Sequence, residues 1–400
     1  MSLQKLWSKN FLISIIANFF TALVFYLLMT TLAMYSSHTF GVSPSIAGFT
    51  ASIYVIGALF GRIFTGKYME LIGRRGVVYG SGICFFLATL TYVIPLNLYL
   101  LLLIRLVHGV TFGILNTALS TVVVSHIPAE HRGEGIGFFS LSATLATAIG
   151  PFIGMFIIQR YPFTYIFWAC TLFASCTALL LFFVRIDNLA LTPTQVLKIK
   201  TQFHFTDFFE RRALPISAFV IVAAMCNASV TAFVTSYATE LNIGSLSSLF
   251  FLVFAVFILL SRPFTGRLLD RRGENIVLIP AILCLAVALL LLSLAHSPAT
   301  FLLAAVFLAL GYGNISSNGQ TIAIQSIPEH RVATATSTYC GSIDTGIGLG
   351  PVLMGLIVPR FGYDGMYLTG SFIALLSLVI YYTLHGRNAA RRAKERKGSV

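Results

Sequence analysis

The stretch "GRIFTGKYMELIGRR" at residues 61–75 returns, altered, as "SRPFTGRLLDRRGEN" at residues 261–275. Each copy closes a long apolar run, and the copies stand 200 positions apart. Shorter elements repeat at nearly the same offset: "IPAEHR" at 127–132 matches "IPEHR" at 327–331. Several matched elements at one offset predict that the chain is two copies of one structural unit.

The first eight letters, "GRIFTGKY", miss the nucleotide-binding pattern G-x-x-x-x-G-K-[ST] only at the last position, Tyr68. A phosphate-binding loop follows a β-strand, and its final Ser or Thr holds magnesium. Here an apolar run of membrane-span length comes first, and the second copy replaces Lys67 with Arg267. Nucleotide binding, and with it an ATP-driven pump, is therefore not expected, and we expect no cofactor.

The composition indicates that lipid is the solvent for most of this chain. Hydrophobic residues make up 57% of the 400 residues and charged residues only 10%, whereas soluble domains carry about 25% charged residues. Backbone in lipid must satisfy its own hydrogen bonds, so apolar runs of about 20 residues are predicted to be helices. We expect twelve spans, at 10–36, 45–66, 77–96, 98–125, 135–158, 163–184, 213–239, 246–268, 276–295, 298–325, 333–357 and 363–385.

The predicted fold is an all-α membrane protein with twelve transmembrane helices in two parallel six-helix repeats. Lys and Arg gather in alternate loops and in the C-terminal tail, and loops of this kind face the cytoplasm. We therefore expect a multi-pass protein of the cell membrane with both termini in the cytoplasm. The expected domains are a six-helix bundle at 1–184, a cytoplasmic linker at 185–212, a second six-helix bundle at 213–386 and a basic cytoplasmic tail at 387–400.

The net charge of +13 is accounted for by the Lys and Arg residues of the loops and tail that are expected in the cytoplasm. The basic tail is expected to contact anionic lipid head groups, so nucleic acid is not an expected partner. The six cysteines lie in apolar runs and form no CxxC pair, which is typical of small buried residues. No metal site is expected, and no pattern of a hydrolytic triad suggests an enzyme.

Residues 66–75 carry the spacing Gly66-x-x-x-Glu70-x-x-Gly73-Arg74-Arg75, which resembles the signature loop between the second and third spans of the major facilitator superfamily. Glu70 departs from the usual Asp. A carboxylate at a helix end can pair with arginines or cap a neighbouring helix, and such contacts can differ between two states. We interpret the loop as a conformational latch, together with the matching residues of the second copy: Gly266, Asp270 and Gly273.

Two further elements resemble the same family. The fourth span contains Arg105-x-x-His108-Gly109, similar to the family pattern R-x-x-Q-G with His in place of Gln. Proline bends a helix and glycine allows close approach. Glycine–proline pairs therefore suit an interface at which two halves rock against each other, here called a rocking seam. They suit plain tight packing as well. Such pairs resemble an element associated with members that export: Gly150–Pro151 and Gly350–Pro351.

Ionisable groups in mid-membrane are costly, and they usually mark function. Asp344 lies near the middle of the eleventh span, and Arg105 and His108 lie one turn apart in the fourth. We expect Asp344, with Arg105 and His108, to carry proton coupling. The alternative is that Asp344 pairs with a buried donor between the second and eleventh spans.

Uncharged polar residues recur at helical spacing in spans one, four, seven and ten. In the resembled family these four helices line the central cavity. Polar stripes can also be hydrogen-bonding contacts between helices. The expected cavity residues are Asn18, Asn116, Asn227, Thr231, Asn314, Asn318 and Gln325.

The resemblance covers nearly the whole chain and implies a secondary transporter that works by alternating access. We expect proton-coupled efflux of small amphiphilic or hydrophobic compounds, because aromatic residues are abundant and charge is sparse. The runner-up is a proton-linked carrier of a specific metabolite, which it exports or imports. A non-transporting membrane sensor would need no polar stripes in four equivalent helices. The expected partners are a small-molecule substrate, protons and the lipid bilayer, and the protein is expected to be a monomer.

Overall fold

The computed structural model describes residues 7–42, 44–94, 97–128, 131–201, 204–325 and 327–391. Helices make up nearly all of this described chain, and no strand occurs in it. The all-α class predicted from the apolar runs is therefore confirmed. Of the predicted tail at 387–400, residues 392–400 lie outside the described residues.

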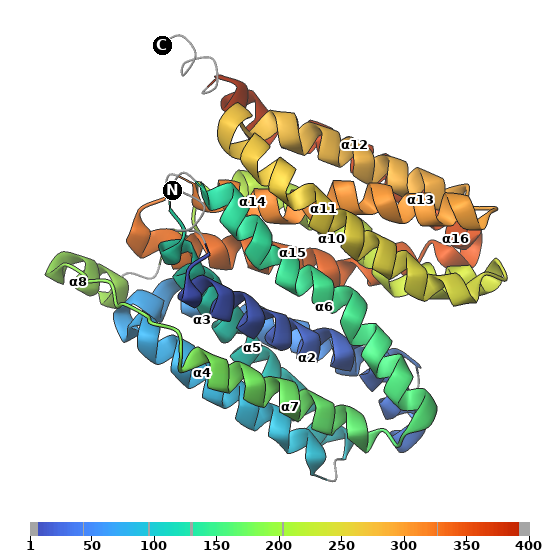
Figure 1. Ribbon diagram of the computed structural model, residues 1–400, viewed down its shortest axis with the longest axis horizontal. Coiled ribbons are helices and arrows are strands. Elements are labelled where there is room, and N and C mark those ends of the chain that lie inside the picture. Colours follow the sequence, from blue (N-terminus) through green and yellow to red (C-terminus); the bar gives the residue numbers. More distant parts are fainter. Residues whose placement is uncertain are drawn as a thin grey trace. The chain divides into compact units, whose positions relative to one another are not determined.

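Figure 1 shows the helices in chain order, from blue to red. The first half contains α2 (Lys9–Phe40), α3 (Pro44–Ile72), α4 (Arg74–Leu90), η1 (Thr91–Val93), α5 (Leu98–His126), α6 (Arg132–Arg160) and α7 (Thr164–Leu181). The linker contains α8 (Pro193–Thr201) and α9 (Phe205–Phe208). The second half contains α10 (Leu214–Glu240), η3 (Gly244–Leu246), α11 (Ser247–Arg272), α12 (Glu274–Ser293), α13 (Pro298–Leu308), η4 (Ala309–Gly313), α14 (Asn314–Ile324), η5 (Glu329–Arg331), α15 (Val332–Gly355), α16 (Val358–Tyr381) and η6 (Tyr382–Gly386).

Ten helical stretches in the described residues are long and apolar enough to cross a membrane. Two further helices, α3 and α15, are not among these ten, although they have 29 and 24 residues. A bilayer crossing needs about 20 residues, so length does not exclude them. The expectation of twelve spans in two parallel repeats therefore stays a prediction.

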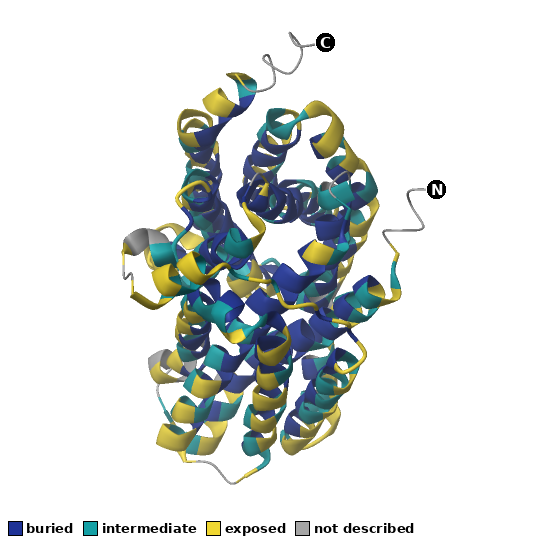
Figure 2. Ribbon diagram, turned by 90° about the vertical axis from the view of Figure 1, so that its left-hand side faces the viewer, coloured by how far each residue is buried: buried dark blue, intermediate teal, exposed yellow. Residues whose placement is uncertain are grey.

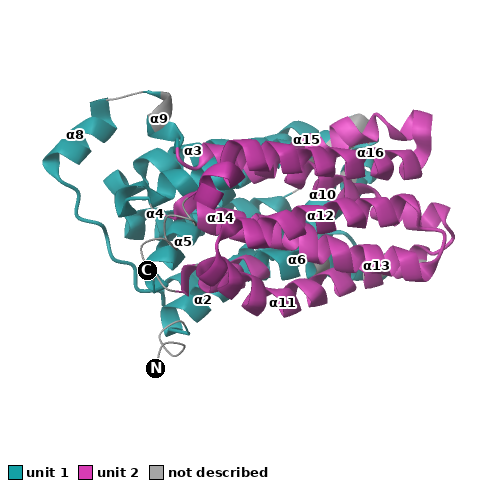
Figure 3. Ribbon diagram, turned by 90° about the horizontal axis from the view of Figure 1, so that it is seen from above, with its two compact units in different colours: residues 1–128, 142–211, 326–341 teal, residues 129–141, 212–325, 342–400 magenta. Residues whose placement is uncertain are grey.

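The chain divides into two compact units, which Figure 3 colours separately. Unit 1 contains α2 to α5, most of α6, α7 and nearly all of the linker, together with the first part of α15. Unit 2 contains α10 to α14 and α16, together with the start of α6 and the rest of α15. The divisions fall so that unit 1 comprises 1–128, 142–211 and 326–341, and unit 2 comprises 129–141, 212–325 and 342–400.

Two glycines give the duplicated signature its local structure. Gly73 separates α3 from α4 with a φ of 99°, and Gly273 separates α11 from α12 with a φ of 91°. Each N–H donates to the carbonyl four residues back, Met69 O at 2.9 Å and Leu269 O at 3.0 Å. Glycine adopts positive φ without steric cost, so each helix ends and the next begins within one residue.

Four glycines bring the backbones of α3 and α5 into direct contact. A Cβ added to Gly57 or Gly61 would lie 2.2 Å from a carbonyl oxygen of α5. A Cβ added to Gly109 or Gly113 would lie 2.1 Å from a carbonyl oxygen of α3. Helices in membranes use small residues for this kind of approach. The sequence pattern drew attention to Gly109 but gave no partner for it.

The two glycine–proline pairs lie inside continuous helices. Helix α6 runs through Pro151 and α15 runs through Pro351. A Cβ on Gly150 would lie 3.0 Å from Tyr26 Cβ in α2, and a Cβ on Gly350 would lie 2.6 Å from the carbonyl oxygen of residue 225 in α10. Both pairs therefore serve close packing, and their role as a rocking seam stays a prediction.

The outer faces of the helices carry exposed residues, as Figure 2 shows. Many of them are large and apolar: Phe60, Trp168, Phe372 and Leu376 are 64%, 52%, 60% and 64% exposed. Soluble proteins rarely expose apolar surface on this scale. These faces are suited to lipid, as the composition predicts.

We predict that Gly109→Ala lowers thermal stability, because the new methyl group would overlap Tyr54 O in α3. Overpacking of this kind costs about 1–3 kcal/mol. The matched control is Gly80→Ala in α4, where an added Cβ meets nothing within 4 Å and helix propensity improves. Thermal unfolding in detergent should give a lower Tm for the first variant only. Equal Tm values would contradict a direct backbone contact.

Candidate functional site

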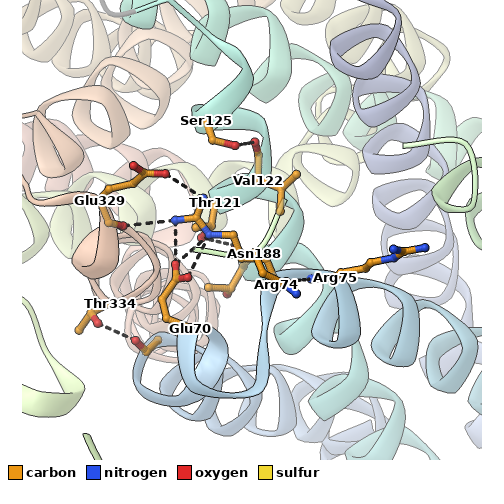
Figure 4. Close-up of polar contacts among 11 residues, drawn as sticks. Glu70, Arg74, Arg75, Thr121, Val122, Ser125, Asn188, Glu329 and Thr334 are labelled. Carbon is orange, nitrogen blue, oxygen red and sulfur yellow. Dashed lines mark hydrogen bonds and ion pairs between the residues drawn. The ribbon is translucent and has the colours of Figure 1, made fainter. Parts of the chain in front are cut away.

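The signature loop forms an ionic cluster of the buried residues Glu70 and Arg74 with the exposed residue Glu329, here called the latch cluster (Figure 4). Arg74 Nε donates to both carboxylate oxygens of Glu70 at 3.0 Å. The same guanidinium donates to Glu329 Oε1 at 3.2 Å and to Glu329 O at 3.4 Å. Glu70 is 7% exposed and Arg74 is 3% exposed. The cluster therefore joins the end of α3, the start of α4 and the turn before α15, all within unit 1.

Burial raises the pKa of Glu70 above its usual range. The hydrogen bonds and the positive charge of Arg74 oppose this effect, and the negative charge of Glu329 adds to it. Glu70 lies beyond the apolar part of α3, at the end of the predicted span 45–66. Its carboxyl group therefore binds a proton more readily in the latch cluster than it would in water.

Two hydroxyl groups of α15 bind the backbone of α3 beside this cluster. Thr334 Oγ1 donates to Gly66 O at 2.5 Å, and Ser337 Oγ donates to Arg62 O at 2.6 Å. A Cβ on Gly66 would lie 2.7 Å from Ser337 Cβ. The first glycine of the signature is thus required because α15 passes directly over it.

The second copy of the signature makes a different contact, within unit 2. Asp270 is exposed, whereas its counterpart Glu70 is buried. Arg267 NH2 instead donates to Glu134 Oε1 at 2.9 Å. Glu134 lies in the first turn of α6 and is 3% exposed. The copies therefore share their backbone turn but differ in the burial of their carboxylates, and a latch role for the second copy stays a prediction.

A buried chain of hydrogen bonds begins at Arg62 on α3. Arg62 NH1 donates to Asn116 Oδ1 at 2.8 Å, Asn116 Nδ2 donates to Asn18 Oδ1 at 3.0 Å, and Asn18 Nδ2 donates to Ser142 Oγ at 2.8 Å. A guanidinium only donates, so it fixes the orientation of both amides. Asn18 and Asn116 therefore link helices, and their exposure to a cavity stays a prediction.

Arg105 and His108 lie one turn apart on α5, and both are fully buried in unit 1. Arg105 Nε donates to Thr50 O at 2.9 Å. Its guanidinium carbon lies 4.3 Å from the centre of the Tyr54 ring, within the range of a cation–π contact. Arg105 is thus held against α3 by a backbone carbonyl and an aromatic face.

The hydrogen bonds of His108 define its tautomer. Nε2 lies 3.0 Å from Thr89 Oγ1, and Nδ1 lies 3.2 Å from the hydroxyl of Tyr92. Thr89 donates its own hydrogen to Phe85 O at 2.8 Å, so it accepts from Nε2–H. Tyr92 then donates to Nδ1. A neutral imidazole with its proton on Nε2 satisfies every partner, which assigns the tautomer from the network.

In unit 2, Asn314 and Asn318 are bound within and between helices. Thr265 Oγ1 in α11 donates to Asn314 Oδ1 at 2.7 Å, and Asn314 Nδ2 donates to Leu310 O at 2.9 Å. Asn318 Nδ2 donates to Asn314 O at 2.9 Å. The carbonyl of Leu310 lies in the π-helical turn η4, a kind of irregularity that frequently occurs at functional sites.

The other sequence-predicted residues of unit 2 have diverse surroundings. Asn227 Oδ1 in α10 is buried and has no hydrogen-bond partner in the described part of the chain. Thr231 Oγ1 donates to Ala228 O of its own helix at 3.0 Å. Gln325 is exposed at the end of α14, and Asp344 is half-buried in α15. Because Asp344 belongs to unit 2 and Arg105 to unit 1, their cooperation in proton coupling stays a prediction.

Several members of these clusters were not predicted from the sequence. Arg62 was matched with Arg262 in the repeat but was given no role, although a cation inside an apolar run is itself a signal. Glu329 belongs to the duplicated "IPEHR", which marked it without naming a partner. Thr334 and Ser337 carried no signal, since hydroxyl residues are common in helices that pack closely.

We predict that Arg74→Ala is strongly destabilising, because it leaves Glu70 buried without its cation. Breaking a buried pair in this way costs about 3–5 kcal/mol. The neighbouring Arg75→Ala is the matched control, since the Arg75 side chain is exposed and points away from the cluster in Figure 4. Its effect should stay within about 0.5 kcal/mol. Denaturation of both variants in detergent tests this, and similar losses would contradict a special role for Arg74.

Glu70 also predicts a pH dependence. Its pKa is about 4.3 in an unfolded chain and is raised in the latch cluster. The folded state therefore binds the proton more tightly, so the contribution of Glu70 to stability is full below the ordinary pKa and declines as pH rises through the raised value. Glu70→Gln stays neutral and lacks this decline. The Tm of the wild type minus that of the variant should fall from about pH 4 to pH 7, and a rising difference would show the opposite shift.

The sequence pattern of the Major Facilitator Superfamily matches residues 14–343 and 219–399 of this chain. An uncharacterized MFS-type transporter of Methanocaldococcus jannaschii is 26% identical over 380 residues, which cover 93% of this chain and 96% of that protein. The multidrug resistance protein MdtG of Salmonella typhi is 23% identical over 403 residues, which cover 97% of each protein.

Solved structures of transporters share the fold. The MFS proton:xylose symporter XylE, bound to 6-bromo-6-deoxy-D-glucose, aligns with a TM-score of 0.73 at 14% identity over 96% of each chain. The human organic anion transporter MFSD10 (TETRAN) aligns with a TM-score of 0.66 at 15% identity, over 94% of this chain and 100% of that one. These likenesses concern the fold, and the sequence match to the family extends over nearly the whole chain. The chain therefore belongs to the Major Facilitator Superfamily and is a multi-pass membrane transporter, not an enzyme.

Proposed function

We propose that this transporter expels small amphiphilic or hydrophobic compounds in exchange for protons, by alternating access. In this proposal it is a monomer in the cell membrane, with twelve spans in two parallel six-helix repeats and both termini in the cytoplasm. The repeats are the bundles at 1–184 and 213–386, joined by the cytoplasmic linker 185–212 and followed by the basic tail 387–400.

An unused acceptor inside unit 2 is the observation that carries a binding role. Asn227 is 8% exposed, and its Oδ1 has no partner in the described residues. Leaving a buried polar group unpaired costs about 1–3 kcal/mol, which a bound molecule with a hydrogen-bond donor would offset. Asn18 and Asn116, by contrast, satisfy each other. The proposal therefore places substrate recognition first at Asn227.

The efflux direction is supported by a relative that aligns with this chain over nearly its whole length. MdtG, which is named a multidrug resistance protein, matches 97% of this chain. The glycine–proline pairs of α6 and α15 add the family element associated with export. A hydrophobic cargo also agrees with the sparse charge of the chain.

Proton coupling is assigned in the proposal to Asp344, with Arg105 and His108 in supporting positions. Asp344 lies twelve residues after Val332, the first residue of α15, and so well inside an apolar helix. Charged groups at such depth are energetically costly, and they usually serve a function. His108 keeps a fixed neutral tautomer in its network, so we assign it the positioning of α5 around Arg105, and we assign the exchangeable proton to Asp344.

A second candidate is a proton-linked carrier of a specific polar metabolite. The chain from Arg62 through Asn116 and Asn18 to Ser142 favours it, because a buried directional network can read a polar molecule. Transport assays with both classes of compound decide between the candidates.

We predict that Asp344→Asn lowers transport driven by a pH gradient at least about tenfold, because Asn carries no exchangeable proton. The measurement uses purified protein in proteoliposomes, with an imposed pH gradient and a panel of hydrophobic dyes and metabolites. Exchange of substrate at equal pH should persist in the variant, since it needs no net proton movement. The matched control is Asp187→Asn, whose carboxylate is exposed in the linker.

Unchanged gradient-driven transport in Asp344→Asn would refute the coupling role. Transport of metabolites alone would favour the second candidate over drug efflux. If folded wild-type protein moved no compound under any gradient, the proposal of secondary transport by this chain would fail.

A further inference from the structure

The linker after α7 is fastened to α3 through an aromatic contact. Lys67 Nζ lies 4.3 Å from the centre of the Phe208 ring, at the end of α9. Lys67 is only 5% exposed, so this contact is shielded from water. A cation over an aromatic face is more strongly attracted when both are desolvated. The lysine that gave the signature its likeness to a phosphate loop therefore covers a linker side chain.

The same segment is fastened to the start of α15. Arg331 Nε donates to Glu210 Oε2 at 2.8 Å, and the backbone N–H of Glu210 donates to Thr338 Oγ1 at 2.9 Å. Thr338 in turn donates to Thr334 O at 2.8 Å. Glu210 is 8% exposed. A partly buried ion pair supported by a backbone hydrogen bond is a specific contact rather than a solvated surface pair.

These contacts use the two helices that the latch cluster also joins. The turn η5 presents Glu329 to Arg74 and Arg331 to Glu210. Thr334 binds α3 directly, at Gly66, and receives the linker indirectly, through Thr338. Linker, α3 and α15 therefore form one hydrogen-bonded group, all of whose members belong to unit 1.

We propose that residues 208–210, here called the strap, are a working part of the latch rather than a passive connection. The inference rests on the alternating-access proposal, in which α15 leaves α3 during the cycle. Because the strap is bound to both helices, such a movement has to break either its contact with α3, Lys67–Phe208, or its contacts with the start of α15, which include the Glu210–Arg331 pair. The strap thus biases the transporter toward the state in which α15 is seated on α3, and weakening the strap shifts the population away from it.

The test measures the seating of α15 on α3 directly. A single cysteine, Ser337→Cys, is introduced into a background whose six native cysteines are replaced. Position 337 is chosen because Ser337 is 3% exposed and becomes accessible only when α15 leaves Arg62 O. The rate of labelling by a water-soluble maleimide then reports the unseated population. Adding Glu210→Gln should raise this rate about five- to tenfold, as loss of a partly buried charge pair allows. The matched control is Asp207→Asn on the same linker, whose carboxylate accepts from His204 N within the linker at 2.7 Å, and it should leave the rate within about twofold.

A double-variant cycle identifies the pair itself. Arg331→Gln alone should raise labelling as Glu210→Gln does, and the double variant should add little, because the two residues share one interaction. The strap is refuted if labelling responds to substrate but not to Glu210→Gln, or if Asp207→Asn has the same effect as Glu210→Gln. Failure of alternating access is a different outcome: labelling of the wild-type background would then respond neither to substrate nor to pH. Thermal unfolding of each variant confirms that the protein remains folded during labelling.

Discussion

Direct backbone contact between α3 and α5 is the constraint on which the rest of unit 1 depends. Gly57 and Gly61 face carbonyl groups of α5, while Gly109 and Gly113 face carbonyl groups of α3, so neither helix can slide or rotate without a clash. This fixed register sets the distances that the buried polar groups need. It places Arg105 at the carbonyl of Thr50 and Arg62 at the amide of Asn116. In lipid, where no water is present to rescue a misplaced donor, a packing error of this kind is also a hydrogen-bonding error.

Sequence alone predicted the helices and pointed to several polar residues that the structure finds buried, but it did not predict their partners. The apolar runs located helices such as α5 and α10 to within a few residues, because span length is set by the bilayer. The signature spacing pointed to Glu70 and Arg74. What it left undetermined was the third member, Glu329, because a contact across about 255 positions of chain depends on tertiary packing rather than on local pattern. Asn18 and Asn116 illustrate the same gap: their polarity was evident, but their mutual hydrogen bond was not.

The two copies have kept the backbone and changed the chemistry. Gly73 and Gly273 both have a positive φ, because glycine adopts this conformation in a one-residue turn between helices without steric cost. The carboxylates that precede them differ, because Glu70 is buried and Asp270 is exposed. Span four is an unbroken helix, whereas the corresponding stretch of the second half contains the π-helical turn η4. The two matching stretches thus share a backbone turn and differ in the side chains that it carries.

Arg62 belongs to two contacts at once, and this has a consequence for water. Its carbonyl oxygen accepts from Ser337 of α15, while its guanidinium begins the amide chain that continues to Asn116 and Asn18. When α15 is seated, Ser337 occupies the carbonyl oxygen and covers it. In the alternating-access proposal, in which α15 moves away, solvent can replace Ser337 on that oxygen, which belongs to the first residue of the polar chain. In that proposal the position of α15 also sets how far water reaches the first donor of the chain, and with it the effective dielectric around Asn116 and Asn18.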